Sequence, residues 1–192
     1  MPGLSASRFV VIQSCVVTML SIDAWLDEKP YKELYDGVVH EKVSPQFDHG
    51  QIQIRLGSLL DEWARDRGAV ASEWRVYLAE GTTLVPDIAF VTRARLAGLS
   101  EDERQKPPFA PDIAIEIRSP KDHERNIRRK TELYLAHGAK LVLDVDPTNR
   151  TVRLNDGASE VGLKPGDTLE HPDFPSLRIP VSEIFEPLDR KF

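Results

Sequence analysis

Residues 112–145 contain the pattern that most restricts the fold: an apolar strand, a helix and a second apolar strand in close succession. The two strands are expected over residues 112–118 and 140–145. Between them Ser119 is expected to cap a helix that runs to about His137, because a serine followed by a proline is typical of a helix start. A unit of this kind predicts two parallel strands joined by a right-handed crossover.

The flanking segments predict further helices and strands. Residues 31–43 are expected to form a hairpin whose turn is Asp36-Gly37, a pair that favours tight turns. Residues 49–67 are expected to form a long helix that stops at Gly68, because apolar residues recur there at helical spacing. The other expected elements are a short helix at 21–27, strands at 73–78, 84–91 and 151–154, a short helix and loop at 93–106, and short strands with a helical turn at 166–185. This order predicts an α/β fold with a mixed sheet flanked by helices, an N-terminal hairpin and a small C-terminal β region.

The composition limits the class of protein. A chain of 192 residues, with 41% hydrophobic and 29% charged residues, fits a globular domain that buries a full core. The single cysteine, Cys15, excludes an intramolecular disulfide and agrees with a reducing cytoplasm. A net charge of −6 gives no support for broad coating by nucleic acid, since phosphate contacts need basic groups. It leaves room for a local basic face beside an acidic site.

The N-terminal region has its own apolar segment, residues 9–20. A membrane-spanning helix needs about 20 apolar residues, so this segment is too short to cross a bilayer. Arg8 precedes it as in a secretory signal, but we find no convincing cleavage site and expect a cytoplasmic protein without membrane attachment. Residues 1–20 are therefore interpreted as an N-terminal extension of uncertain role, and residues 21–192 as a single domain.

Two acidic residues stand at unusual places in apolar strands. Asp87 opens one strand, and Glu116 lies in the middle of the strand at 112–118. Burial of an unpaired carboxylate is costly, so Glu116 must meet a cation, a metal ion or water. The plain alternatives are a strand-end cap for Asp87 and an ion pair of Glu116 with Arg118 or Lys130.

One basic residue of the following helix is expected to reach inward. Lys130 lies about 60° from Ile127 around a helix axis, on the flank of the apolar stripe that includes Tyr134. It would then lie over the end of the strand at 112–118. The alternative is a rim lysine whose stem covers apolar surface and whose ammonium stays in water.

Seven short motifs follow one another along the chain. They are Tyr31-Lys-Glu-Leu-Tyr-Asp-Gly, the helix led by His49, Val-Pro-Asp87, Ile-Glu116-Ile-Arg-Ser-Pro, Arg-Arg-Lys130-Thr-Glu-Leu-Tyr134, His-Gly138-Ala and Val-Asp146-Pro. An acid at a strand start, a glutamate in a neighbouring strand and a basic group resemble the PD-(D/E)xK nuclease superfamily. The order of the motifs over residues 20–188 is similar to its Uma-two branch, whose members are described as restriction endonucleases. The resemblance implies a restriction-endonuclease-like fold.

The resemblance also implies an activity and a metal. A magnesium-dependent endonuclease would hydrolyse phosphodiester bonds of DNA, with Mn²⁺ as a substitute for Mg²⁺. Asp87, Glu116 and the backbone carbonyl of Ile117 would bind the metal, and Lys130 would take the role of the catalytic lysine. Such a metal neutralises charge on the phosphate and lowers the pKa of the attacking water. The resemblance further implies a homodimer, and no organic cofactor is expected.

Three residues are candidates for auxiliary roles. Arg118 occupies a position where the branch more often has a small or apolar residue, so it either competes with Lys130 for the lysine role or pairs with the strand glutamate. His49 and Gln51 would form the outer edge of the site. The alternative for that region is a helix capped by Asp48, with a surface histidine beside it.

Two other functions remain open at this point. The first is a catalytically silent nucleic-acid-binding protein on the same fold, which the acidic balance and the lack of a separate target-recognition domain favour. The second is a structural homo-oligomer in which residues 9–20 form an interface strand. The complete set of Asp87, Glu116 and Lys130 favours the nuclease. Metal-dependent cleavage of DNA distinguishes it from both alternatives.

Overall fold

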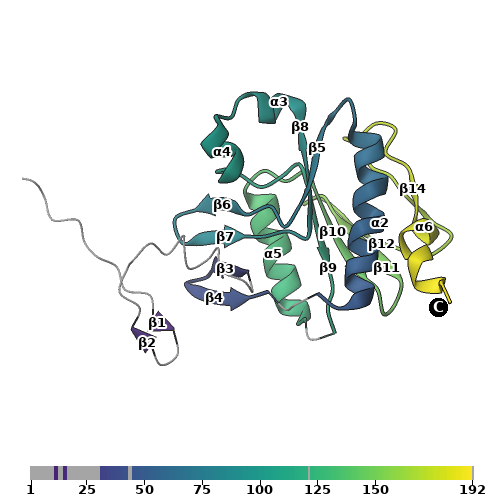
Figure 1. Cartoon of the computed structure of the whole chain (residues 1–192), viewed down its shortest axis with the longest axis horizontal. Coiled ribbons are helices and arrows are strands. Elements are labelled where there is room, and N and C mark those ends of the chain that lie inside the picture. The colour runs from purple at the N-terminus through teal and green to yellow at the C-terminus, as the bar shows by residue number, and fades with distance from the viewer. Residues whose placement is uncertain (1–10, 13–14, 17–30, 43–44, 121, 192) are drawn as a thin grey trace, which may run out of the picture.

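The computed structural model describes residues 11–12, 15–16, 31–42, 45–120 and 122–191 (Figure 1). The strands are β1 Val11–Ile12, β2 Cys15–Val16, β3 Lys32–Tyr35, β4 Val38–Glu41, β5 Gly68–Ser72, β6 Val76–Ala79, β7 Thr82–Leu84, β8 Ile88–Thr92, β9 Ile113–Ile117, β10 Leu141–Asp146, β11 Thr151–Asn155, β12 Glu160–Leu163, β13 Thr168–Leu169 and β14 Ile179–Pro180. The helices are α2 Phe47–Ala64, α3 Arg93–Ala97, α4 Glu101–Gln105, α5 Glu124–Ala136, α6 Val181–Phe185 and the 3-10 helix η1 Glu186–Asp189. None of the described helices has the length and apolar character that crossing a membrane requires. The expected helix at 21–27 lies outside the described residues.

A six-stranded sheet forms the centre of the fold, in the order β12-β11-β10-β9-β8-β5. Strands β9 and β10 run parallel, while every other neighbouring pair in this sheet is antiparallel. A second sheet has the order β4-β3-β7-β6. The mixed sheet is confirmed, and so is the pair of parallel neighbours around α5.

The two faces of the central sheet are covered by different elements, as Figure 1 shows. Helix α2 packs on one face, where its apolar stripe of Ile52, Leu56 and Leu60 meets the three isoleucines of β9. The other face carries α5 and the small sheet, with the fully buried Tyr134 of α5 against apolar residues of β6, β7 and β10. The alternation along β9 places Glu116 on this second face.

The N-terminal hairpin is confirmed. Strands β3 and β4 pair in antiparallel register around Asp36 and Gly37, which both have positive φ angles of 52° and 73°. Positive φ at both central residues is the requirement of a type I′ turn. The hairpin matters for function because its strand β3 faces the core with all four residues buried.

Several expected boundaries were wrong. The long helix occupies Phe47–Ala64 rather than 49–67. The segment expected as two strands at 73–78 and 84–91 contains β6, β7 and β8, and β5 precedes it. The edge strand β12 was not expected. Short strands with mixed polarity pair through tertiary contacts, so the local pattern does not reveal them.

The start of α5 was also wrong. The helix begins at Glu124, with His123 at the N-cap, instead of at Ser119. The reason is a local pair of hydrogen bonds that precedes the helix. The Ser119 backbone N–H donates to the Asp122 carboxylate at 2.6 Å, and the Asp122 backbone N–H donates to the Ser119 carbonyl at 2.9 Å. These bonds offer the backbone an alternative to the first helical turn.

Gly68 does not stop the first helix; it begins β5, where the backbone of β8 comes very close. A Cβ at Gly68 would lie 2.0 Å from the Val91 carbonyl oxygen. Gly68→Ala should therefore lower the free energy of unfolding by about 1–3 kcal/mol or more, as overpacking against a backbone atom does. Urea denaturation followed by circular dichroism measures this.

The matched control is Gly57→Ala in α2. The nearest atom to its added Cβ would lie 4.0 Å away, at Ile88. An alanine there should be neutral or stabilise the helix by up to about 1 kcal/mol. Equal stability of the Gly68 and Gly57 variants would contradict the close approach as the reason for Gly68.

Candidate metal and catalytic site

The register of β8 and β9 brings Asp87 and Glu116 together. Ile88 pairs with Ile115 in antiparallel register, so Asp87, one residue before β8, lies opposite Glu116. Directly opposite residues share a face and have Cβ atoms about 5 Å apart. Both side chains are buried, with 2% and 5% of their surface exposed. The two carboxylates that are expected to bind a metal therefore lie side by side on the same face of the central sheet.

Asp87 is surrounded by hydrogen-bond donors. Its Oδ2 accepts the backbone N–H of Ile117 at 2.6 Å and lies 3.2 Å from His49 Nε2. Its Oδ1 accepts from the Lys42 ammonium at 2.6 Å. Burial raises the pKa of Asp87, but the Lys42 charge and the His49 hydrogen bond outweigh it and hold this pKa below its ordinary value. The carboxylate is thus ionised and fixed in orientation.

Glu116 has a different set of partners. Its Oε2 accepts from the Lys130 ammonium at 2.6 Å, and its Oε1 accepts from the Tyr134 hydroxyl at 2.7 Å. Burial raises the pKa of Glu116 to about 7, against the opposing effect of Lys130 and with further raising by Asp87. The glutamate is therefore a costly buried group that additional positive charge would stabilise.

Lys130 points inward from α5, as expected from its place beside Ile127. Only 5% of its surface is exposed, and its ammonium also lies 3.0 Å from Glu33 Oε1. Burial lowers the pKa of Lys130, but Glu116 and Glu33 outweigh it and hold this pKa above its ordinary value. Lys130 is therefore a protonated donor in this arrangement and not a rim lysine.

Two further residues of the site were missed in the sequence. Glu33 in β3 accepts the backbone N–H of Val85 at 2.8 Å in addition to its contact with Lys130. The sequence did offer one signal for Glu33, because a charged residue beside Leu34 in an expected strand must find a partner when that strand is buried. Lys42 follows β4 and carries no pattern that marks it, because its role depends on contacts with residues more than 30 positions away.

The buried cluster contains more negative than positive charge. Its carboxylates are Glu33, Asp87 and Glu116, and its ammonium groups are Lys42 and Lys130. A divalent cation fits this excess, since magnesium prefers oxygen ligands and commonly binds one or two carboxylates with water and phosphate. Among the described residues, no three His, Cys, Asp or Glu side chains form a complete metal cage. Backbone oxygen, water and phosphate would supply the remaining ligands.

The backbone of Ile117 is oriented to contribute. In an extended strand the N–H and C=O of one residue point to the same side. The Ile117 N–H points to Asp87, while the next N–H, of Arg118, points the opposite way and donates to the Val145 carbonyl of β10. The Ile117 carbonyl therefore lies on the side of Asp87, where the expected ligand would be.

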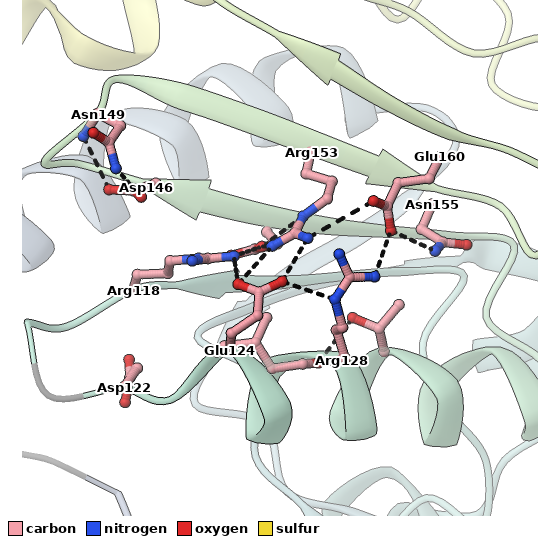
Figure 2. A network of polar contacts seen from close by, with 12 residues as sticks. Arg118, Asp122, Glu124, Arg128, Asp146, Asn149, Arg153, Asn155 and Glu160 are labelled. Carbon is pink, nitrogen blue, oxygen red and sulfur yellow. Dashed lines mark hydrogen bonds and ion pairs between the residues drawn. The ribbon is translucent and has the colours of Figure 1, made fainter.

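Arg118 belongs to another group of side chains. It donates to Asp144 at 2.7 and 2.5 Å and lies 2.7 Å from Glu124. Arg153 joins the same network, where it binds Glu124 (Figure 2). It also donates to Asp144. Among the described residues, the basic partner of Glu116 is Lys130 and not Arg118.

The outer edge of the site contains one of the two expected residues. His49 is buried beside Asp87, but the described residues that line the cavities around Asp87 do not include Gln51. Gln53 is there instead and donates to the Asp87 carbonyl at 2.9 Å. The alternative of an Asp48 cap is wrong, because the N-cap of α2 is Gln46.

Two cavities meet at the cluster. One, of about 350 Å³, is lined by Asp87, Glu116 and Lys130 together with His40 and Asn126. The other, of about 800 Å³, runs between α2 and β5. Lys42, His49 and Asp87 line both cavities. The carboxylates are therefore reachable from the surface although they are buried.

Comparisons with known proteins show the family and the fold of the chain. The sequence model of Uma2, described as "Putative restriction endonuclease", matches residues 20–182. A crystal structure from Anabaena variabilis ATCC 29413, described as "a putative nuclease belonging to DUF820", superposes with a TM-score of 0.75 at 23% sequence identity. The match covers 83% of this chain and 92% of that chain. No curated protein matches the sequence. The structural match confirms the nuclease-like α/β fold class.

Proposed function

Because the chain belongs to the Uma2 family, we propose that it is a magnesium-dependent endonuclease that hydrolyses phosphodiester bonds of DNA. The observation that carries this proposal is the β8–β9 register, which sets Asp87 opposite Glu116 with Lys130 bound to the latter. Asp87, Glu116 and the Ile117 carbonyl would hold the metal. These are hard oxygen donors beside an excess of buried negative charge, which is the donor chemistry that Mg²⁺ or Mn²⁺ requires.

Each residue would have a separate role in the reaction. Bound metal would neutralise phosphate charge and lower the pKa of a water. Lys130 would hold Glu116 and donate a hydrogen bond to the attacking water or to the charge that develops on phosphate. His49 and the Ile117 N–H fix the Asp87 carboxylate. The protonated state of Lys130 supports a role as donor rather than as base.

Metal removal provides the direct test. The purified chain should nick supercoiled plasmid DNA with Mg²⁺ or Mn²⁺, lose this activity in excess EDTA, and regain it when Mg²⁺ is restored. Gel electrophoresis measures the nicked and linear products. Cleavage that persists in EDTA would contradict the metal role, and metal binding without any cleavage would favour the catalytically silent alternative.

The homodimer stays a prediction of the family resemblance, and the cytoplasmic localisation stays a prediction of the sequence. One feature of the surface supports self-association. Phe47 and Ile54 of α2 expose 66% and 73% of their surface. They are seven positions apart and thus share one helix face, and Ile54 also lines the larger cavity.

A further inference from the structure

The Lys42 ammonium has an environment that resembles a cation site. Its Nζ donates to Asp87 Oδ1 at 2.6 Å, to the Val85 carbonyl at 2.8 Å and to Glu73 Oε2 at 3.1 Å. Only 15% of the Lys42 side chain is exposed. Two carboxylates and a backbone carbonyl are also the ligand types that a hard divalent cation takes.

The residues that supply the two carboxylates have other contacts that do not involve Lys42, and the Ile117 N–H binds the Asp87 carboxylate itself. Gln53 Nε2 donates to Glu73 Oε1 at 3.2 Å and to the Asp87 carbonyl at 2.9 Å. The Glu73 backbone N–H also donates to the Asp87 carbonyl, at 3.3 Å. Glu73 adopts a φ of 53°, which is uncommon for a residue other than glycine. The surrounding contacts therefore fix a preformed group of oxygen atoms around the Nζ position.

Lys42 and Lys130 form ion pairs with different carboxylates. Lys130 binds Glu116 and Glu33, whereas Lys42 binds Asp87 and Glu73. Asp87 would therefore contact the proposed metal while it also contacts Lys42. Nucleases with two metal ions place them about 3.5–4 Å apart at such a site.

We propose that the Lys42 ammonium occupies the position of a second divalent cation, so that the chain binds one metal ion where removal of Lys42 would allow two. This inference rests on the proposed function, since the first ion is the one assigned to Asp87 and Glu116. Lys42 is a positioning residue: it holds Oδ1 of Asp87 and supplies fixed positive charge between the two cavities.

The test counts bound Mn²⁺ by isothermal titration calorimetry on the full chain. The parent protein should bind one ion, and Lys42→Ala should bind two. The double variant Lys42→Ala/Glu73→Gln should return to one, because the second ion loses a carboxylate. Lys140→Ala is the matched control, since this lysine is half exposed and contacts Asp112 instead. It should bind one ion.

If the parent binds one ion, a single ion in Lys42→Ala would overturn the proposal. Absence of the metal site that the proposed function assigns to Asp87 and Glu116 gives a different result: the parent would bind none, while Lys42→Ala would gain one ion that Glu73→Gln removes. Adding Glu116→Gln to Lys42→Ala should weaken the first ion and leave the second. The number of bound Mn²⁺ ions therefore separates failure of the first metal site from failure of the role proposed for Lys42.

A second measurement on the parent protein does not depend on whether the Lys42 variant folds. Acetylation of lysine amines, read by mass spectrometry, reports the accessibility of Lys42. Its acetylation rate should be the same within about twofold with and without saturating Mn²⁺, because the ion and Lys42 are present together. A several-fold rise on adding Mn²⁺ would show that metal displaces Lys42, and would overturn the proposal.

Discussion

Asp87→Asn and Glu116→Gln should each lower the rate of metal-dependent DNA cleavage by roughly 10²–10³-fold or more, while the domain stays folded. Each change keeps the shape of the side chain and removes one negative charge from the place where the carboxylates meet. Asn at position 87 still accepts the Ile117 N–H, so the β8–β9 contact survives. Single-turnover plasmid nicking in Mg²⁺ measures the loss, and circular dichroism checks the fold.

The matched control is Asp144→Asn. Asp144 pairs with Glu116 across β9 and β10, lies on the same face and is equally buried, at 5% exposure. It binds Arg118 and Arg153 rather than the Lys42 and Lys130 groups. Its loss should lower stability and leave cleavage within about an order of magnitude of the parent. Equal loss in Asp144→Asn would mean that any buried acid on this face affects cleavage through the fold, and would contradict a metal role specific to Asp87 and Glu116.

The part of the fold that could be predicted from the sequence is the part with strong periodicity. Strand β9 and helix α5 follow from alternating isoleucines and from the stripe that contains Ile127 and Tyr134. The Asp36-Gly37 turn follows from backbone preference alone. Short strands such as β5 and β12 were missed because their residues pair only after the sheet has formed.

The site divides in the same way. The meeting of Asp87 and Glu116 was expected from their strand positions together with the family resemblance, and the inward direction of Lys130 from helix geometry. Glu33 and Lys42 were missed, because each reaches the cluster from the hairpin through contacts distant in sequence. Local patterns predict which residues turn inward, but not which inward residues meet.

Lys130→Met should also have a large effect, in both cleavage and stability. The variant keeps the apolar stem and removes the only ammonium that contacts Glu116 among the described residues. Cleavage should fall by roughly 10²–10³-fold. Because Glu116 and Glu33 would lose their shared buried cation, the free energy of unfolding should fall by about 3–5 kcal/mol. Plasmid nicking and urea denaturation measure the two effects.

Arg118→Ala is the comparison that assigns the role of the basic residue. Arg118 is bound to Asp144 and Glu124, so its removal should cost stability and leave most of the cleavage rate. Retained cleavage in Lys130→Met together with loss of cleavage in Arg118→Ala would transfer the role to Arg118.

The double variant Lys130→Met/Glu33→Gln separates the effect of Lys130 on stability from its effect on cleavage. It removes one buried negative charge along with the positive one, so it should regain part of the lost stability. Cleavage should not return with it, because neutralising Glu33 restores the charge balance without restoring a donor beside Glu116.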